Sequence, residues 1–69
     1  MRRVLPINAS KIKYYRLIKG MKAIELARLT GLTRASISAY EKGIQMPTGN
    51  NILKIAEVLG VEPKDLVVG

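Results

Sequence analysis

Apolar residues recur at three- and four-residue spacings along most of the chain, in short segments separated by glycines. There is no strand-like alternation, no internal repeat and no low-complexity tract. The segments with helical spacing span residues 9–19, 21–30 and 34–42, and a fourth starts at Thr48 or Asn50 and runs to residue 59. A glycine follows each segment, as is common after a helix. Pro63 suits the first position of a final helical turn, with Leu66 packing back. The pattern predicts an all-α fold of five short helices.

The same spacing indicates which residues face the core. In the first segment the predicted inward stripe consists of Ile12, Tyr15 and Leu17 or Ile18. Asn8 or Ser10 is the predicted N-cap of that helix. In the second segment the residues at helical spacing are Ile24, Leu26, Ala27 and Leu29. In the fourth the residues predicted to point mostly inward are Ile52, Leu53, Ile55, Ala56 and Leu59.

The stretch from residue 23 to 42 carries the most information. Two helices of about eight residues meet at a four-residue turn over positions 30–33. Ala27 is small enough for a close helix crossing, and Gly31 tolerates the positive φ that the turn needs. Thr33 can cap the following helix, which Ile37 can anchor from below. Together these features are typical of a helix-turn-helix.

Charge is the first indication of function. The 69 residues fit one domain, and 12 Lys and Arg against 5 Asp and Glu give a net charge of +7. Residues 1–50 carry ten basic and two acidic side chains (+8), whereas residues 51–69 carry two basic and three acidic ones (−1). This asymmetry favours a cationic face for a polyanion, with a generic solvated surface as the alternative.

Composition argues against several other classes of protein. The chain has no Cys and no His, so we expect no disulfide, no zinc site, no cofactor and no imidazole-based catalysis. We therefore predict that it is not an enzyme. No apolar stretch approaches the length of a membrane span or of a signal peptide, and the lack of Cys fits the cytoplasm. We assign residues 1–8 to an N-terminal arm, in which Arg2 and Arg3 either follow DNA or form a solvated tail, and residues 9–69 to the domain.

From Ile12 to Leu66 the sequence resembles the lambda-repressor and Cro type of helix-turn-helix domain. The matching positions are Arg16, Leu26-Ala27, Gly31, Ser36-Ile37-Ser38, Glu41-Lys42-Gly43, Pro47, Ile52-Leu53-Lys54-Ile55-Ala56, Leu59-Gly60-Val61 and Leu66. The resemblance implies a compact five-helix domain that binds operator DNA as a symmetric dimer and controls transcription.

The resemblance also implies an ion pair between Arg16 and Glu41 that ties the first helix to the end of the third. The alternative is two independent solvated charges. One departure from the family lies at Lys22-Ala23, where a capping Ser, Thr or Asn followed by Gln is usual. That Gln commonly braces both a phosphate and the recognition helix, so the usual network of contacts is in doubt here.

The third helix is predicted to read bases. If Ile37, Tyr40 and Glu41 point inward, steps of about 100° place Ala35, Ser38, Ala39 and Lys42 on the outer arc. Arg34, at the helix start, can donate two hydrogen bonds to O6 and N7 of guanine, with a phosphate contact as the alternative. The alanines can touch thymine methyl groups. The predicted base-reading residues are Arg34, Ala35, Ser38 and Ala39.

Phosphate contacts are predicted at the starts of the second and third helices and at the end of the third helix. The residues are Lys22, Ala23, Thr33 and Lys42, with free backbone N–H groups at Lys22 and Ala23. The predicted function is transcriptional regulation, as a repressor, through a pseudo-palindromic operator in double-stranded DNA. We expect a homodimer, which forms either in the free protein or only on DNA. The alternatives are an antitoxin or adaptor that binds a protein partner such as a toxin, and nonspecific nucleic-acid coating.

Overall fold

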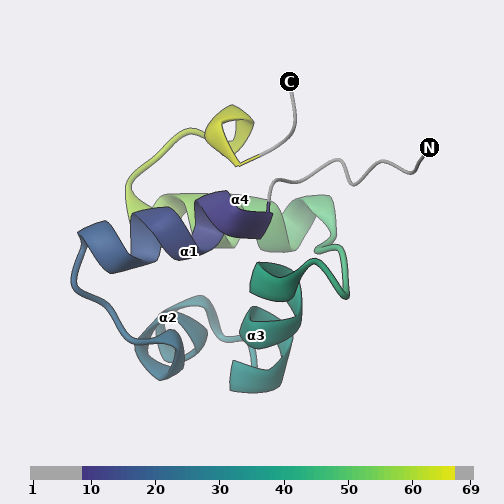
Figure 1. Cartoon of the computed structure of the whole chain (residues 1–69). Coiled ribbons are helices and arrows are strands. Elements are labelled where there is room, and N and C mark those ends of the chain that lie inside the picture. The colour runs from purple at the N-terminus through teal and green to yellow at the C-terminus, as the bar shows by residue number, and fades with distance from the viewer. Residues whose placement is uncertain (1–8, 67–69) are drawn as a thin grey trace.

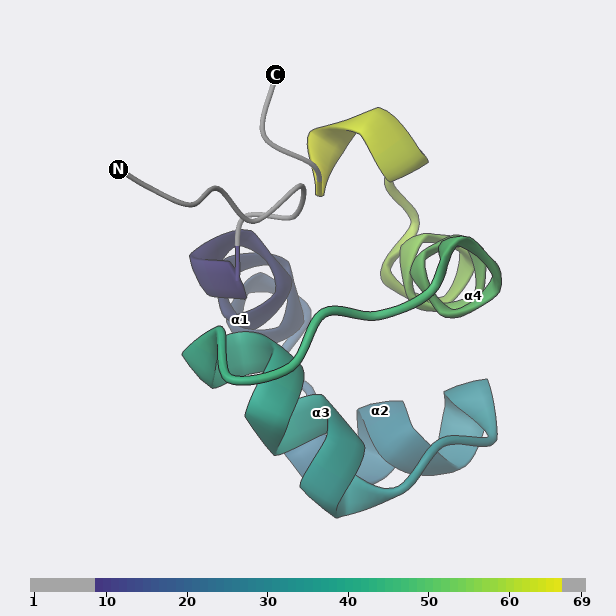
Figure 2. The same ribbon diagram turned by 90° about the vertical axis from the view of Figure 1, so that its right-hand side faces the viewer.

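The computed structural model describes residues 9–66, which contain helices and no strand. The elements are α1 (Ala9–Ile18), α2 (Ala23–Thr30), α3 (Arg34–Lys42), α4 (Gly49–Leu59) and the 3-10 turn η1 (Pro63–Asp65) (Figure 1). Helices α1 and α4 form one layer, and α2 and α3 form the other (Figure 2). Helix α3 packs against both α2 and α1, while α2 also packs against α4. None of the helices in this range is long and apolar enough to cross a membrane.

The prediction of five helices is wrong in its last element, because residues 63–65 form a 3-10 turn rather than an α-helix. The amide of Leu66 donates to the carbonyl of Pro63 at 3.0 Å, which is an i to i+3 bond. Forming an α-helix is unfavourable until several i to i+4 bonds follow the first turn. Leu66 itself is fully buried, so its predicted inward packing is confirmed.

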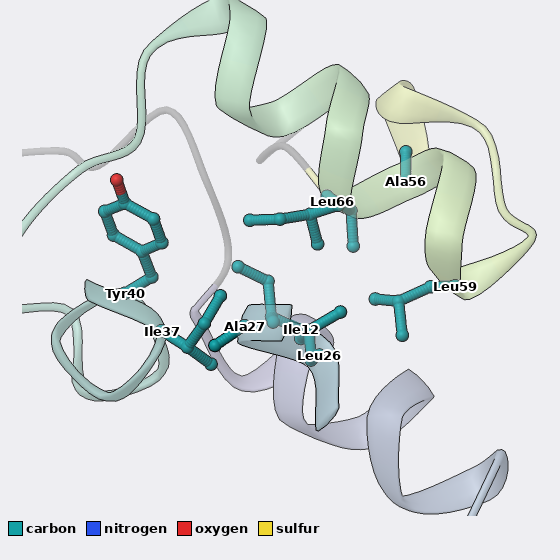
Figure 3. Close-up of a cluster of buried hydrophobic side chains, with 9 residues drawn as sticks. Ile12, Leu26, Ala27, Ile37, Tyr40, Ala56, Leu59 and Leu66 are labelled. Carbon is teal, nitrogen blue, oxygen red and sulfur yellow. The ribbon is translucent and has the colours of Figure 1, made fainter. Parts of the chain in front are cut away.

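The core draws buried apolar side chains from every helix and from the end of η1 (Figure 3). Its members are Ile12, Leu26, Ala27, Ile37, Tyr40, Ile55, Ala56, Leu59 and Leu66. Gly43 follows α3 and Gly60 follows α4 as C-caps with positive φ, as the spacing of the glycines predicted. Thr48 caps α4 by accepting a hydrogen bond from the amide of Asn51 at 3.3 Å.

Several apolar residues whose spacing indicated the core lie at the surface instead, among them Ile24 and Leu29 in α2, which are 48% and 60% exposed. Leu17 and Ile18 are 58% and 63% exposed, and Leu53 in α4 is 56% exposed. In α1 the reason is rotation, because Ile12 and Arg16 occupy the inward side and leave 17 and 18 on the opposite one. Ser10 is not the N-cap of α1, which begins one residue earlier. Asn8, the other predicted cap, lies outside the described residues, as do Arg2, Arg3 and residues 67–69.

Candidate nucleic-acid interface

The turn between α2 and α3 is fixed by hydrogen bonds at its start and at its glycine. The hydroxyl of Thr30, which is buried, donates to the carbonyl of Leu26 at 2.8 Å. Gly31 has a φ of +76°, and this left-handed conformation lets the amide of Leu32 donate to the carbonyl of Ala27 at 2.9 Å. Ala27 is itself buried, as a small residue at a close helix crossing should be. The turn therefore sets the direction in which α3 leaves α2.

Helix α3 is anchored through its inner side chains. Ile37 is fully buried and Tyr40 is 5% exposed. The hydroxyl of Tyr40 accepts a hydrogen bond from Nδ2 of Asn51 in α4 at 3.1 Å. Sequence reasoning missed this bond, since nothing in the spacing of positions 40 and 51 links a tyrosine in one helix to an asparagine in another. Apolar packing and this bond together hold α3 in one orientation.

Arg16 and Glu41 form the ion pair that the resemblance implied. Nε of Arg16 donates to Oε2 of Glu41 at 2.6 Å and Nη2 donates to Oε1 at 3.0 Å, a bidentate geometry. Nη1 of the same arginine donates to the carbonyl of Met21 at 2.9 Å. Both side chains of the pair are about nine-tenths buried. One guanidinium thus joins α1, the turn after it and the last turn of α3.

The hydrogen bonds to Glu41 raise the pKa of Arg16 above its ordinary value, and the charge of Glu41 acts in the same direction against the effect of burial. A raised arginine pKa contributes stability that is fully present below the ordinary arginine pKa and is lost only as the pH rises through the raised one. On the arginine side, the pair therefore persists across the whole neutral and alkaline range used for binding experiments.

The outer side of α3 presents the side chains predicted to read bases. Arg34, Ala35 and Lys42 are exposed, while Ser38 and Ala39 are half-buried. Thr33 precedes them as the N-cap, and its hydroxyl accepts from the amide of Ser36 at 3.0 Å. Apart from the arginine and lysine at its two ends, this side carries only short side chains. A flat surface can therefore approach the helix closely.

The start of α2 differs from the prediction. The amide of Lys22 is not free, because it donates to Oε1 of Glu25 at 2.8 Å. Lysine offers no acceptor as an N-cap, so Glu25 supplies the reciprocal half of a capping box and places its carboxylate at the positive end of the helix. The side chain of Lys22 is exposed, and Ala23 is half-buried against the core.

Sequence reasoning also missed a bond between two hydroxyl groups at the start of α3. The Thr33 hydroxyl that caps α3 donates to Oγ of Ser36 at 3.0 Å. Its donor and one of its acceptor positions are thus engaged within the protein. A serine three residues after a capping threonine is the sequence signal that could have revealed this pairing.

A helix held from below by buried side chains, and presenting short and cationic side chains from a basic domain, defines the class of helix-turn-helix DNA-binding domains. The family model described as helix-turn-helix matches residues 12–66. An uncharacterized HTH-type transcriptional regulator of Methanocaldococcus jannaschii is 36% identical over 59 residues, which are 86% of this chain and 89% of that protein. The chain therefore belongs to the helix-turn-helix family, in its lambda-repressor-like form.

Among the solved structures similar to this chain are two regulators bound to DNA. The biofilm master regulator SinR in complex with DNA has a TM-score of 0.80 at 30% identity, over 84% of this chain and 97% of that one. The P22 c2 repressor in complex with a synthetic operator has a TM-score of 0.85 over 97% and 98% of the two chains. At 24% identity the P22 similarity shows the fold alone. Two longer relatives, from Haemophilus influenzae and Aeropyrum pernix, match over only 19% and 20% of their lengths.

Proposed function

We propose that this protein regulates transcription as a repressor, by docking α3 in the major groove of a specific site in double-stranded DNA in the cytoplasm. The observation that carries the proposal is the division of α3 into a buried inner side and an exposed outer side of short and cationic residues. A major groove about 12 Å wide admits one α-helix. The curated relatives are named as transcriptional regulators, which favours this function over an antitoxin or adaptor.

Arg34 is the residue that supplies most of the discrimination between bases. It is exposed at the first position of α3, from which a long side chain reaches forward into the groove. Two parallel hydrogen bonds to O6 and N7 of guanine contribute about 1–3 kcal/mol of discrimination. Ala35 and Ala39 touch thymine methyl groups, and Ser38 accepts or donates one hydrogen bond. A half-site therefore contains a guanine beside one or more thymines.

Phosphate contacts position α3 without reading sequence. The ammonium groups of Lys22 and Lys42 lie at exposed positions at the start of α2 and the end of α3. The backbone amides of Ala23 and Thr33 complete the predicted set, since the Thr33 hydroxyl already donates its hydrogen to Ser36. Because Glu25 binds the amide of Lys22, the lysine acts here through its charge and not through its main chain.

A single helix of nine residues contacts too few base pairs for tight and selective binding. The protein therefore binds a pseudo-palindromic operator as a homodimer. This dimer exists in the free protein or forms only on DNA. Two α3 helices in successive major grooves on one side of the duplex lie about 34 Å apart, one helical turn. Light scattering with and without the operator measures this assembly directly.

The test is Arg34→Ala, compared with Arg28→Ala, which removes the same charge from an exposed position in α2. Affinities are measured for a site selected from random duplexes and for the same site with its guanine replaced, at two salt concentrations. Relative to the wild type, Arg34→Ala should bind the selected site about 1–3 kcal/mol more weakly. On the site without its guanine, the variant and the wild type should bind almost equally. Equal losses on every sequence would refute base reading by Arg34. If the wild type does not bind the selected site about 10³-fold more tightly than random DNA, the function itself is refuted.

A further inference from the structure

Three large apolar side chains lie along the outer side of α1. Tyr14, Leu17 and Ile18 are 57%, 58% and 63% exposed, and their spacing of three and four residues places them on one face of the helix. We call these three residues the α1 stripe. The other large exposed apolar residues among those described are dispersed over α2, α4 and the loop after α3. Single exposed apolar residues are ordinary, whereas a contiguous group marks an interaction site.

The rotation of α1 keeps the stripe outside the fold. Ile12 is fully buried on the inner side, and Arg16, one turn further, is held by Glu41 and the carbonyl of Met21. Turning Leu17 or Ile18 toward the core would break these bonds and leave the carboxylate of Glu41 buried without its partner. The stripe is therefore a fixed surface of this fold.

Lysines flank the stripe on both sides. Steps of about 100° give the angular order Lys13, Leu17, Tyr14, Ile18 and Lys11 around the outer half of the helix. Tyr15, at the border beyond Lys11, has its ring 5.8 Å from the Lys11 ammonium group and 5.3 Å from the ring of Tyr14. Helix α1 contains no acidic residue. The surface is thus apolar along its centre and positively charged along its edges.

We propose that the α1 stripe binds an acidic amphipathic helix of a partner protein. The apolar side of that helix covers Leu17, Ile18 and Tyr14, and its carboxylates lie over Lys11 and Lys13. A second copy of this chain fits poorly, because two such faces would set lysine against lysine in molecules of net charge +7. DNA fits poorly too, since a phosphate backbone offers nothing to the apolar centre. The proposal does not depend on which bases α3 reads.

The test uses two synthetic helical peptides with the same leucine face, one flanked by glutamates and the other by lysines. Each is titrated into the isotope-labelled full chain while NMR follows its methyl and amide signals. The acidic peptide should bind at least tenfold more tightly than the basic one and shift the methyl signals of Leu17 and Ile18. The double variant Leu17→Ser/Ile18→Ser should weaken this binding at least tenfold. Leu53→Ser, equally exposed but on α4, should leave it unchanged.

A charge exchange separates the lysines beside the stripe from the overall charge of the chain. Lys11→Glu/Lys13→Glu should transfer the preference to the lysine-flanked peptide. Lys54→Glu/Lys64→Glu changes the net charge equally at positions outside α1 and should keep the preference for the acidic peptide.

Several outcomes would overturn the proposal. One is the absence of binding up to millimolar peptide, and another is equal binding of both peptides. Contacts between Leu17 and residues 1–8 or 67–69 in the free protein would assign the stripe to the chain's own ends. Self-association that Leu17→Ser/Ile18→Ser abolishes would assign it to a second copy. A more than threefold loss of operator affinity in that variant, with its fold intact, would assign it to DNA.

Discussion

The inner and outer sides of the nine-residue helix α3 differ in burial and in the contacts that their side chains make. On the inner side Ile37 and Tyr40 are buried, and Glu41 is held by two hydrogen bonds from Arg16. On the outer side Arg34 and Ala35 are exposed, and none of the predicted base-reading side chains is fully buried. The inner side fixes where the helix lies and the outer side is left to recognise a ligand. Substitutions on the two sides should therefore separate stability from binding.

The largest expected effect comes from breaking the buried ion pair. Glu41→Ala should reduce the free energy of unfolding by about 3–5 kcal/mol, because it leaves the guanidinium of Arg16 buried without its carboxylate. Urea unfolding measures the loss. The double variant Arg16→Met/Glu41→Leu should recover most of it, since well-packed apolar residues often replace a buried pair without cost. A loss below about 1 kcal/mol for the single variant would mean that the pair behaves as a solvated one.

Removing apolar volume on the inner side comes next. Ile37→Ala should cost about 2–5 kcal/mol, because the side chain is fully buried and its removal leaves a cavity. Ser38→Ala, on the adjacent outer position, should change the free energy of unfolding by less than about 0.5 kcal/mol. Thermal unfolding followed by circular dichroism compares the two variants. Similar losses in both would show that α3 has no division into two sides.

The cap of α3 should have a smaller effect on stability. Thr33→Ala removes the acceptor for the amide of Ser36 and should cost about 1 kcal/mol. Thr33→Ser keeps the hydroxyl and serves as the control. Lys22→Ala, at the corresponding position of α2, should be nearly neutral because the lysine side chain accepts no hydrogen bond there. If Lys22→Ala and Thr33→Ala cost the same, the two helix starts do not differ as described.

The smallest change in stability is expected on the outer side, together with a large change in binding. Ala35→Leu should alter the free energy of unfolding by less than about 0.5 kcal/mol, since the position is exposed. The added side chain should hold α3 away from the base edges and weaken operator binding at least tenfold. Lys54→Leu, exposed on α4, is the matched control and should bind normally. Unchanged operator binding by Ala35→Leu would place this residue outside the interface.

Local signals predicted much of the fold. The bounds of α3 were predicted to the residue, because a capping threonine precedes the helix and a glycine with positive φ follows it. Features that depend on a second element did not follow from periodicity, although the resemblance to a known family implied the contact between Arg16 and Glu41. Helix α1 has apolar residues on both sides. Arg16 turns inward, where it contacts Glu41 of α3 and the carbonyl of Met21, while Leu17 and Ile18 turn out.

The same distinction applies to the candidate site. Outward positions on α3 follow from periodicity once Ile37 and Tyr40 are taken as inner residues. The state of the Lys22 amide does not, because periodicity says nothing about whether the Glu25 side chain folds back to the helix start. The contact between Tyr40 and Asn51 likewise depends on how α3 meets α4.

The three hydrogen bonds of Arg16 have a consequence for the entropy of association. Because one side chain bridges the first helix, the following turn and the last turn of α3, loosening any one of them relative to the others breaks at least one of these bonds. The recognition helix is therefore preorganised, and little backbone ordering remains to oppose complex formation. Hydrogen exchange should show the amides of α1 and α3 opening together, as one cooperative unit.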